Sequence, residues 1–331
     1  MAETLRYAVI GLGSMGRHHV RNVRALEGVE LVALVDPFGD KFGVADGLPV
    51  YESVEEVFVH NIDAAVVSVP TAHHHGVSMA LADAGVHALV EKPLANTLNE
   101  AEELVTAFAE KNLVGAVGYV ERCNPALLQM RKKISEGLLG EVYQVSTRRQ
   151  SPFPARIADV GVVKDLATHD IDLTAWVVGS KYKSIAATVA HRAGRAQEDM
   201  VSVAGELENG VIVNHLVNWL TPFKDRQITV VGERGALVAE TVLGDLTFYE
   251  NGVNRIEWDQ VSNFRGVSEG EMTRFAITKR EPLAVEHENF RDAIVGKSSE
   301  IVTMEEALNT MKVVDSVLAS AAEGRLINLG L

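Results

Sequence analysis

The sequence predicts an α/β protein in which a doubly wound parallel sheet, a Rossmann domain, is followed by an α+β domain with a large, open, mostly antiparallel sheet. Up to about residue 120, short β-rich runs alternate with helical stretches, and beyond it several β-rich runs follow one another directly. Alternation is typical of parallel βαβ units, and consecutive strands favour an antiparallel sheet. Because 331 residues suffice for two cores, we expect domains over residues 1–121 and 122–331.

The first element is a glycine-rich turn. Gly11, Gly13 and Gly16 come between the apolar run 7–10 and a helical stretch. In a dinucleotide site the first glycine permits the turn, the second lets the backbone approach a pyrophosphate, and the third packs helix on strand. Asp36 lies 36 − 16 = 20 positions beyond Gly16, where an acid accepts hydrogen bonds from the ribose and repels a 2′-phosphate. The turn therefore predicts NAD rather than NADP.

The rest of the first domain repeats the alternation. Amphipathic segments separate four further predicted strands, at residues 31–35, 64–69, 88–90 and 114–118. Right-handed crossovers would place the ligand crevice at the carboxyl ends of these strands.

In the second domain the predicted helices and strands no longer alternate. Helical stretches are expected at 125–136 and 162–178, with a strand beginning at 142. Successive β-rich runs then follow at 184–191, 200–206, 211–219, 227–231, 236–241 and 245–249. Two more helices, 286–295 and 304–322, complete the chain, whereas residues 251–282 show no clear period.

Composition limits the classes of function. The chain is 47% hydrophobic and 23% charged, and its formal net charge of −14 disfavours nucleic-acid and anionic-membrane surfaces as partners. No apolar run approaches the ~20 residues that cross a bilayer, and no signal segment is evident, so the cytoplasm is expected. A single cysteine, Cys123, excludes an internal disulfide and a thiolate zinc site.

A candidate catalytic lysine follows the strand at 88–90. Pro93 biases Lys92 towards an extended conformation, which ends the strand and can turn the lysine into the crevice. The alternative is a solvated loop lysine. The position beside the predicted cofactor cleft favours the functional interpretation.

A candidate general base lies in the helix predicted at 162–178. Asp165 and His169 are four residues apart, so both side chains share one face, which Asp172 and Trp176 continue. Oxidation of an alcohol requires removal of the hydroxyl proton while hydride leaves the same carbon, and imidazole titrates near working pH. The alternative is an ordinary surface pair.

Arginines and histidines suggest two further sites. Arg148, Arg149 and Arg156 fall in a segment without acidic residues, and guanidinium groups bind phosphate oxygens in bidentate fashion. The alternative is ion pairing within this acidic protein. Residues 73–75 are consecutive histidines, which cannot face one ion from a regular helix or strand, so we assign no metal.

Taken together, the motifs resemble those of the Gfo/Idh/MocA family of sugar and inositol dehydrogenases. The resemblance runs from residue 6 to the end of the chain, closing helix included. Its motifs, in order, are Gly11–Gly16 with Arg17-His18-His19, Pro70-Thr71-x-x-His74, Ala84-Gly85-x-His87, Glu91-Lys92-Pro93, and Gly161 through Asp165 and His169 to Asp172. One departure is Val160-Gly161, where many members have two glycines.

The resemblance implies a cofactor site and a catalytic set. Lys92 would hydrogen-bond the reacting hydroxyl and orient the nicotinamide, His169 would exchange the proton, and Asp165 would position the substrate. Residues implied in NAD binding are Gly11, Gly13, Ser14, Met15, Gly16, Asp36, Pro70, Thr71, His74, Glu91 and Lys92. The open sheet of the second domain would form a homodimer or homotetramer interface.

A narrower resemblance concerns the substrate. Residues 120–125 and 152–166 are similar to the branch that contains UDP-N-acetylglucosamine 3-dehydrogenases, although Cys123 and Gln150-Ser151 depart from its pattern. The substrate would be a UDP-N-acetylhexosamine oxidised at its 3-hydroxyl, bound by Asn124, Arg149, Arg156, Lys92 and His169. The alternatives are an inositol or free-sugar dehydrogenase and, in a different class, an NAD-binding sensor or regulatory protein.

Overall fold

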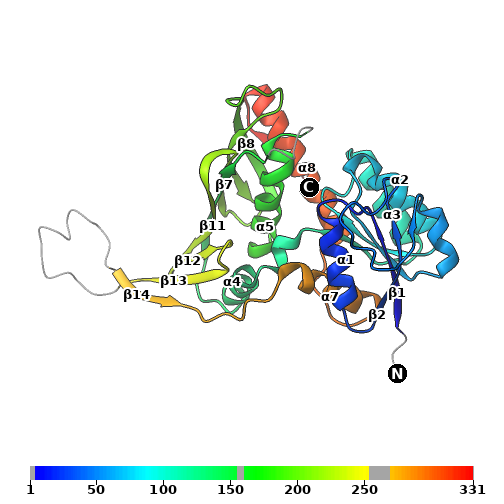
Figure 1. Cartoon of the computed structure of the whole chain (residues 1–331). Helices are drawn as coiled ribbons and strands as arrows, with labels where there is room; N and C mark the ends of the chain where they lie inside the picture. Colours follow the sequence, from blue (N-terminus) through cyan, green and yellow to red (C-terminus); the bar gives the residue numbers. More distant parts are fainter. Residues whose placement is uncertain (1–3, 155–159, 253–268, 331) are drawn as a thin grey trace, which may run out of the picture. The chain divides into compact units, whose positions relative to one another are not determined.

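The chain forms two compact units in a computed structural model that describes residues 4–154, 160–252 and 269–330 (Figure 1). The first unit comprises Met1–Val120 and Glu281–Met311, and the second comprises Glu121–Arg280 and Lys312–Leu331. The predicted boundary at residue 121 agrees with the first division. The prediction of one continuous domain over 122–331 differs, because residues 281–311 return to the first unit. An amphipathic pattern shows that a helix has an apolar face, but not which sheet that face covers.

The first unit is built on a six-stranded parallel sheet of order β3-β2-β1-β4-β5-β6. The strands are β1 (Leu5–Ile10), β2 (Val29–Val35), β3 (Val50–Tyr51), β4 (Ala64–Val67), β5 (His87–Glu91) and β6 (Gly115–Gly118). The doubly wound sheet is thus confirmed, with the strand order of a dinucleotide-binding fold. The additional strand, β3, has two residues, too few to show a pattern in the sequence.

Helices cover both faces of this sheet, as two separate clusters of buried side chains show. The helical segments are α1 (Gly16–Ala25), η1 (Glu55–His60), η2 (Thr71–His73), α2 (His74–Asp83), α3 (Leu98–Glu110) and α7 (Pro282–Ile294). The chain begins α3 with a capping box, in which the side chains of Thr97 and Glu100 each accept a bond from the other's backbone N–H. From α7, Phe290 is fully buried and meets Tyr7 of β1 edge-on, with ring centroids 5.9 Å apart.

The second unit contains a nine-stranded sheet of order β14-β13-β12-β11-β7-β10-β9-β8-β15. Its strands are β7 (Val142–Pro152), β8 (Tyr182–Ala190), β9 (Met200–Leu207), β10 (Ile212–Asn218), β11 (Leu220–Gly232), β12 (Gly235–Glu240), β13 (Asp245–Asn251), β14 (Glu269–Arg274) and β15 (Ile327–Asn328). Among the described pairs only β7 with β10 is parallel, so the mostly antiparallel sheet is confirmed. Of the unassigned segment 251–282, β14 is described and residues 253–268 lie outside the described residues.

Helices pack on one face of this large sheet (Figure 1). They are η3 (Val120–Cys123), α4 (Pro125–Ser135), the π-helical turn η4 (Val163–Ala167), α5 (Thr168–Val178) and the end of α8 (Met304–Glu323). Strand side chains alternate, so that Val145, Val213 and Val230 are fully buried beneath these helices. The helix predicted at 162–178 is therefore present, but its first turn is π-helical.

Candidate functional site

The glycine-rich turn between β1 and α1 has room for a diphosphate. Gly11 has φ +91°, and a Cβ there would lie 2.6 Å from the Ser68 carbonyl oxygen; at Gly16 it would lie 1.9 Å from that of Gly11. At Gly13 a Cβ would meet nothing within 4 Å. No side chain caps the start of α1, so the positive end of its dipole can attract an anion at this open position. The turn fits the diphosphate of NAD.

Asp36 is fixed at the end of β2. Its Oδ2 accepts a hydrogen bond from Leu12 N–H at 2.8 Å, and its Oδ1 accepts one from Phe38 N–H at 2.9 Å. Each carboxylate oxygen has a second lone pair, so the group can still accept from ribose hydroxyls. The bond to Leu12 joins the acid to the glycine-rich turn, as the predicted ribose site requires.

His74 connects two loops at the carboxyl edge of the sheet. Its Nδ1 lies 2.8 Å from the Pro93 carbonyl oxygen and its Nε2 lies 2.9 Å from that of Val69. The ring is 1% exposed, and burial lowers the pKa of His74 although both carbonyls favour the protonated ring. Both nitrogens are engaged with backbone, so we infer that His74 acts by holding the loops that carry Pro70 and Lys92.

Glu91 and Lys92 follow the end of β5. One carboxylate oxygen of Glu91, Oε1, lies 2.8 Å from His19 Nε2, and the other accepts the Lys92 backbone N–H at 3.2 Å. Burial by itself would raise the pKa of Glu91. The hydrogen bond and charge of His19, with the charge of Lys92, hold that pKa below its usual value.

In the second unit, Asp165 and His169 lie where the chain passes from η4 into α5. A π-helical turn closes from residue i to i+5, so residues four apart still lie about one turn apart. Both side chains are half-buried, and the three residues between them, Leu166, Ala167 and Thr168, are buried. The helix that carries them is therefore firmly packed, and the two groups remain on its accessible side.

Gly161 and Glu198 fix the start of that helix. Glu198 Oε1 accepts the Val163 N–H at 3.0 Å, and the Glu198 carbonyl accepts the Val162 N–H at 3.0 Å. A Cβ at Gly161 would lie 1.9 Å from the Glu198 carboxylate, so a larger residue there would displace the group that accepts the Val163 N–H. A carboxylate at a helix N-terminus accepts hydrogen bonds from the N–H groups there, and its negative charge is attracted to the positive end of the helix dipole.

Two predicted substrate ligands are engaged elsewhere. Arg149 is 2% exposed, and its guanidinium pairs at 2.9 Å both with Asp170 of α5 and with Glu121 of η3. Both acids lie in distant parts of the sequence. The segment around Arg149 contains no acidic residue, so the local sequence did not indicate these pairs. Asn124 caps α4 by accepting the Ala126 N–H and donates to the Thr241 carbonyl.

The other two arginines differ from Arg149. Arg148 is half-exposed and pairs with Asp225 at 3.2 Å, while Arg156 lies outside the described residues. For Arg148 and Arg149 the structure shows the ion pairs that were the alternative, and the pairs of Arg149 compete with its predicted role as a diphosphate ligand.

Several buried polar groups were not predicted. His19 of α1 contacts both Glu91 and His287, and Arg122 makes a bidentate pair with Asp172 at 2.7 and 2.8 Å. Their partners lie 50 to 268 positions away in the chain, so no local pattern indicates them. The only local signal for His19 was its place on the helix that follows the glycine-rich turn.

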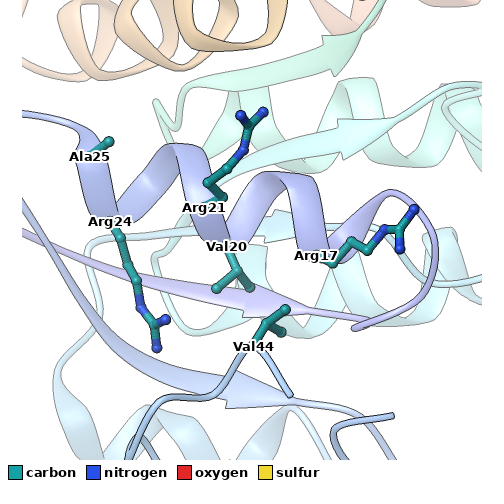
Figure 2. Close-up of a pocket in the computed structure, with 6 residues that line it drawn as sticks. All are labelled: Arg17, Val20, Arg21, Arg24, Ala25 and Val44. Atoms are coloured by element: carbon teal, nitrogen blue, oxygen red, sulfur yellow. The ribbon is translucent and has the colours of Figure 1, made fainter. Parts of the chain in front are cut away.

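A pocket runs along the outer face of α1 (Figure 2). Arg17, Arg21 and Arg24 line it beside Val20, Ala25 and Val44. Arg21 pairs with Glu281, Arg24 approaches Asp46 at 3.7 Å, and the Arg17 guanidinium lies over the Phe42 ring at 4.8 Å. This row gives the acidic chain a local basic surface that begins one residue after Gly16.

Metal-binding and membrane-spanning features were also sought in the described ranges. Within them, no group of three or more His, Cys, Asp and Glu side chains could hold a metal ion. No described helix is long and apolar enough to span a bilayer.

Two family models match the chain. Residues 5–119 match the oxidoreductase family with an NAD-binding Rossmann fold, and residues 127–238 match the GFO/IDH/MocA C-terminal domain. The chain belongs to the Gfo/Idh/MocA family. It is therefore an NAD-binding oxidoreductase.

Relatives of this Gfo/Idh/MocA protein act on different substrates. The UDP-N-acetylglucosamine 3-dehydrogenase of Acidithiobacillus ferrooxidans is 28% identical over 88% of both chains. An inositol 2-dehydrogenase of Rhizobium meliloti is 26% identical over 98% of this chain and 99% of its own. A solved structure of the Acidithiobacillus ferrooxidans enzyme has the same fold, with a TM-score of 0.84 at 24% identity over 96% of this chain and 98% of that one.

Proposed function

We propose that this protein is an NAD-dependent dehydrogenase that oxidises a secondary hydroxyl of a UDP-N-acetylhexosamine, at position 3 of the sugar. The observation that carries the proposal is the 28% identity to a UDP-N-acetylglucosamine 3-dehydrogenase over 88% of both chains. The resemblance of residues 120–125 and 152–166 to that branch supports the same substrate.

The proposed chemistry assigns one role to each of three side chains. NAD, when bound at the glycine-rich turn, supplies the hydride acceptor. His169 takes up the hydroxyl proton, because imidazole exchanges protons near neutral pH. Lys92 donates a hydrogen bond to the oxygen as negative charge develops there, and Asp165 orients the substrate.

The substrate's diphosphate needs a ligand other than Arg149, whose guanidinium is buried in two ion pairs. The nucleotide-sugar proposal therefore rests on the similarity to the UDP-N-acetylglucosamine 3-dehydrogenase and not on an arginine cluster. Oxidation of inositol is a second candidate, because an inositol 2-dehydrogenase aligns with 98% of the chain. Inhibition by UDP distinguishes the two, since a nucleotide-sugar site binds UDP and a polyol site has no use for it.

The proposal is tested by NADH absorbance at single-turnover protein concentration, so that cofactor retained by the protein is seen. The panel comprises UDP-N-acetylglucosamine, its uronic-acid form, myo-inositol and glucose. We expect NADH with the UDP sugars alone, and a fall of about 10²-fold or more in Lys92→Ala and His169→Ala. A signal with inositol or glucose alone would refute the substrate. NADH binding without turnover of any compound would refute the dehydrogenase proposal for this panel.

A further inference from the structure

Four titratable side chains are buried together in the first unit, and one of them accepts the backbone N–H of Lys92. His19 of α1 and His287 of α7 are 0% exposed, and Glu286 of α7 is 7% exposed. The fourth side chain is Glu91 of β5, which is 14% exposed and contacts His19. Burial of polar groups is costly unless they are hydrogen-bonded, so such a cluster needs a reason.

The contacts form a chain that ends on Lys92. His287 Nε2 lies 3.0 Å from His19 Nδ1, with the two rings edge-on at 82°. His19 Nε2 lies 2.8 Å from Glu91 Oε1, and Glu91 Oε2 accepts the Lys92 N–H. Each link fixes the orientation of the next side chain, because an imidazole bonded through both nitrogens cannot rotate freely.

The two carboxyl groups of the cluster have pKa values shifted in opposite directions. Burial, and then the charge of Glu91, raise the pKa of Glu286 well above its ordinary value, which favours its protonated form. Burial likewise lowers the pKa of His287 well below its ordinary value, so that ring is neutral. Glu91 carries the negative charge, and its partners are His19 and Lys92.

Glu91 is confined on a third side as well. A Cβ at Gly118 of β6 would lie 3.3 Å from Glu91 Oε2, so glycine leaves just enough space for the carboxylate. Both oxygens are thus anchored and the side chain has little freedom. The backbone of Lys92 is held through its N–H by a group that is itself immobile.

We propose that Glu91 is a positioning residue for Lys92, and that His19 and His287 hold Glu91 in place. The inference rests on the proposed catalytic role of Lys92. The network sets where the lysine side chain leaves the backbone, so that its ammonium is in place before substrate arrives. Preorganisation of this kind matters because misplacement by about 1 Å can cost about 10²-fold in rate.

The first test is Glu91→Gln, which keeps the size of the side chain and removes its charge. We expect kcat to fall about 10²-fold, a larger loss than any fall in NADH affinity. Glu103→Gln is the matched control, because Glu103 makes a 2.8 Å contact with His75 in the same unit, unconnected to Lys92. If the Glu91→Gln enzyme were as active as the Glu103→Gln enzyme, the proposal would be overturned. Equal losses of NADH affinity and of kcat in Glu91→Gln would also overturn it.

A double-mutant cycle separates positioning from general structural support. If Glu91 acts through Lys92, adding Glu91→Gln to Lys92→Ala lowers the single-turnover rate no further. An additional loss equal to that in the native background would show an independent role and contradict the inference.

A third measurement does not depend on turnover. Reductive ¹³C-methylation labels the lysines, and the NMR resonance that Lys92→Ala removes belongs to Lys92. We expect Glu91→Gln to shift that resonance and Glu103→Gln to leave it unchanged. An unshifted resonance would overturn the positioning role, whereas failure of the sugar panel with a shifted resonance would refute the proposed function alone.

Discussion

At the residue scale, the surroundings of two neighbouring carboxyl groups in the first unit, Glu91 and Glu286, shift their pKa values in opposite directions. Glu91 has an imidazole and a backbone N–H as partners, and it is ionised. Oε2 of Glu286 has no hydrogen-bond partner among the described residues, and burial together with the charge of Glu91 raises the pKa of this carboxyl group. When two carboxyl groups lie close together, ionisation of one raises the pKa of the other, so the better hydrogen-bonded group takes the charge first.

Glu286→Gln should stabilise the protein more as the pH rises. The folded-state pKa of Glu286 is raised, so the native protein is most stable below the ordinary pKa and loses stability as pH rises towards the folded value. Glutamine does not titrate and removes this loss. We expect the gain in melting temperature to be larger at about pH 8 than at about pH 6. The exposed Glu305→Gln is the control, with the same change at both pH values.

At the element scale, ion pairs join α5 to its neighbours in the second unit. Arg149 of β7 reaches Asp170, and Arg122 of η3 reaches Asp172, so the helix that carries His169 is tied by two buried carboxylates. A buried pair is not itself strongly stabilising, but loss of one member leaves a charge without compensation.

Arg149→Ala should therefore lower the free energy of unfolding. Removal of the guanidinium would leave Asp170 buried without this partner, whereas Glu121 would keep its pair with Arg226, and we expect a cost of about 3–5 kcal/mol in the free energy of unfolding. Arg148→Ala, on the same strand but half-exposed, should cost less than about 1 kcal/mol. Urea denaturation measures both. A stable Arg149→Ala protein with weakened affinity for UDP sugars would instead restore Arg149 as a substrate ligand.

The same element shows how far the sequence was informative. The helix at 162–178 and the position of Asp165 and His169 on it follow from periods and motifs within about twenty residues. The partners of Arg149 and His19 come from segments far along the chain, where a local pattern carries no signal. The π-helical first turn was not predicted either.

At the scale of the whole molecule, the first unit is completed by the end of the chain. Phe290 fills its core, Val302 accepts the Val117 N–H, and Thr303 forms a β-bridge with Ala116 of β6. Met304 lies against Gly115, where a Cβ would be 2.6 Å from its sulfur. Residues 281–311 therefore extend the sheet edge and close one apolar cluster.

A fragment of residues 1–120 should fail to fold stably, although it contains the whole glycine-rich site. Loss of the Phe290 side chain alone would cost about 3–5 kcal/mol, a large part of the stability of a typical domain. Residues 1–120 joined to 281–311 by a flexible Gly/Ser linker should unfold cooperatively and bind NADH. Calorimetry and NADH fluorescence compare the two fragments. If residues 1–120 alone melted cooperatively and bound NADH as tightly as the joined form, the C-terminal segment would be a surface addition and not part of this core.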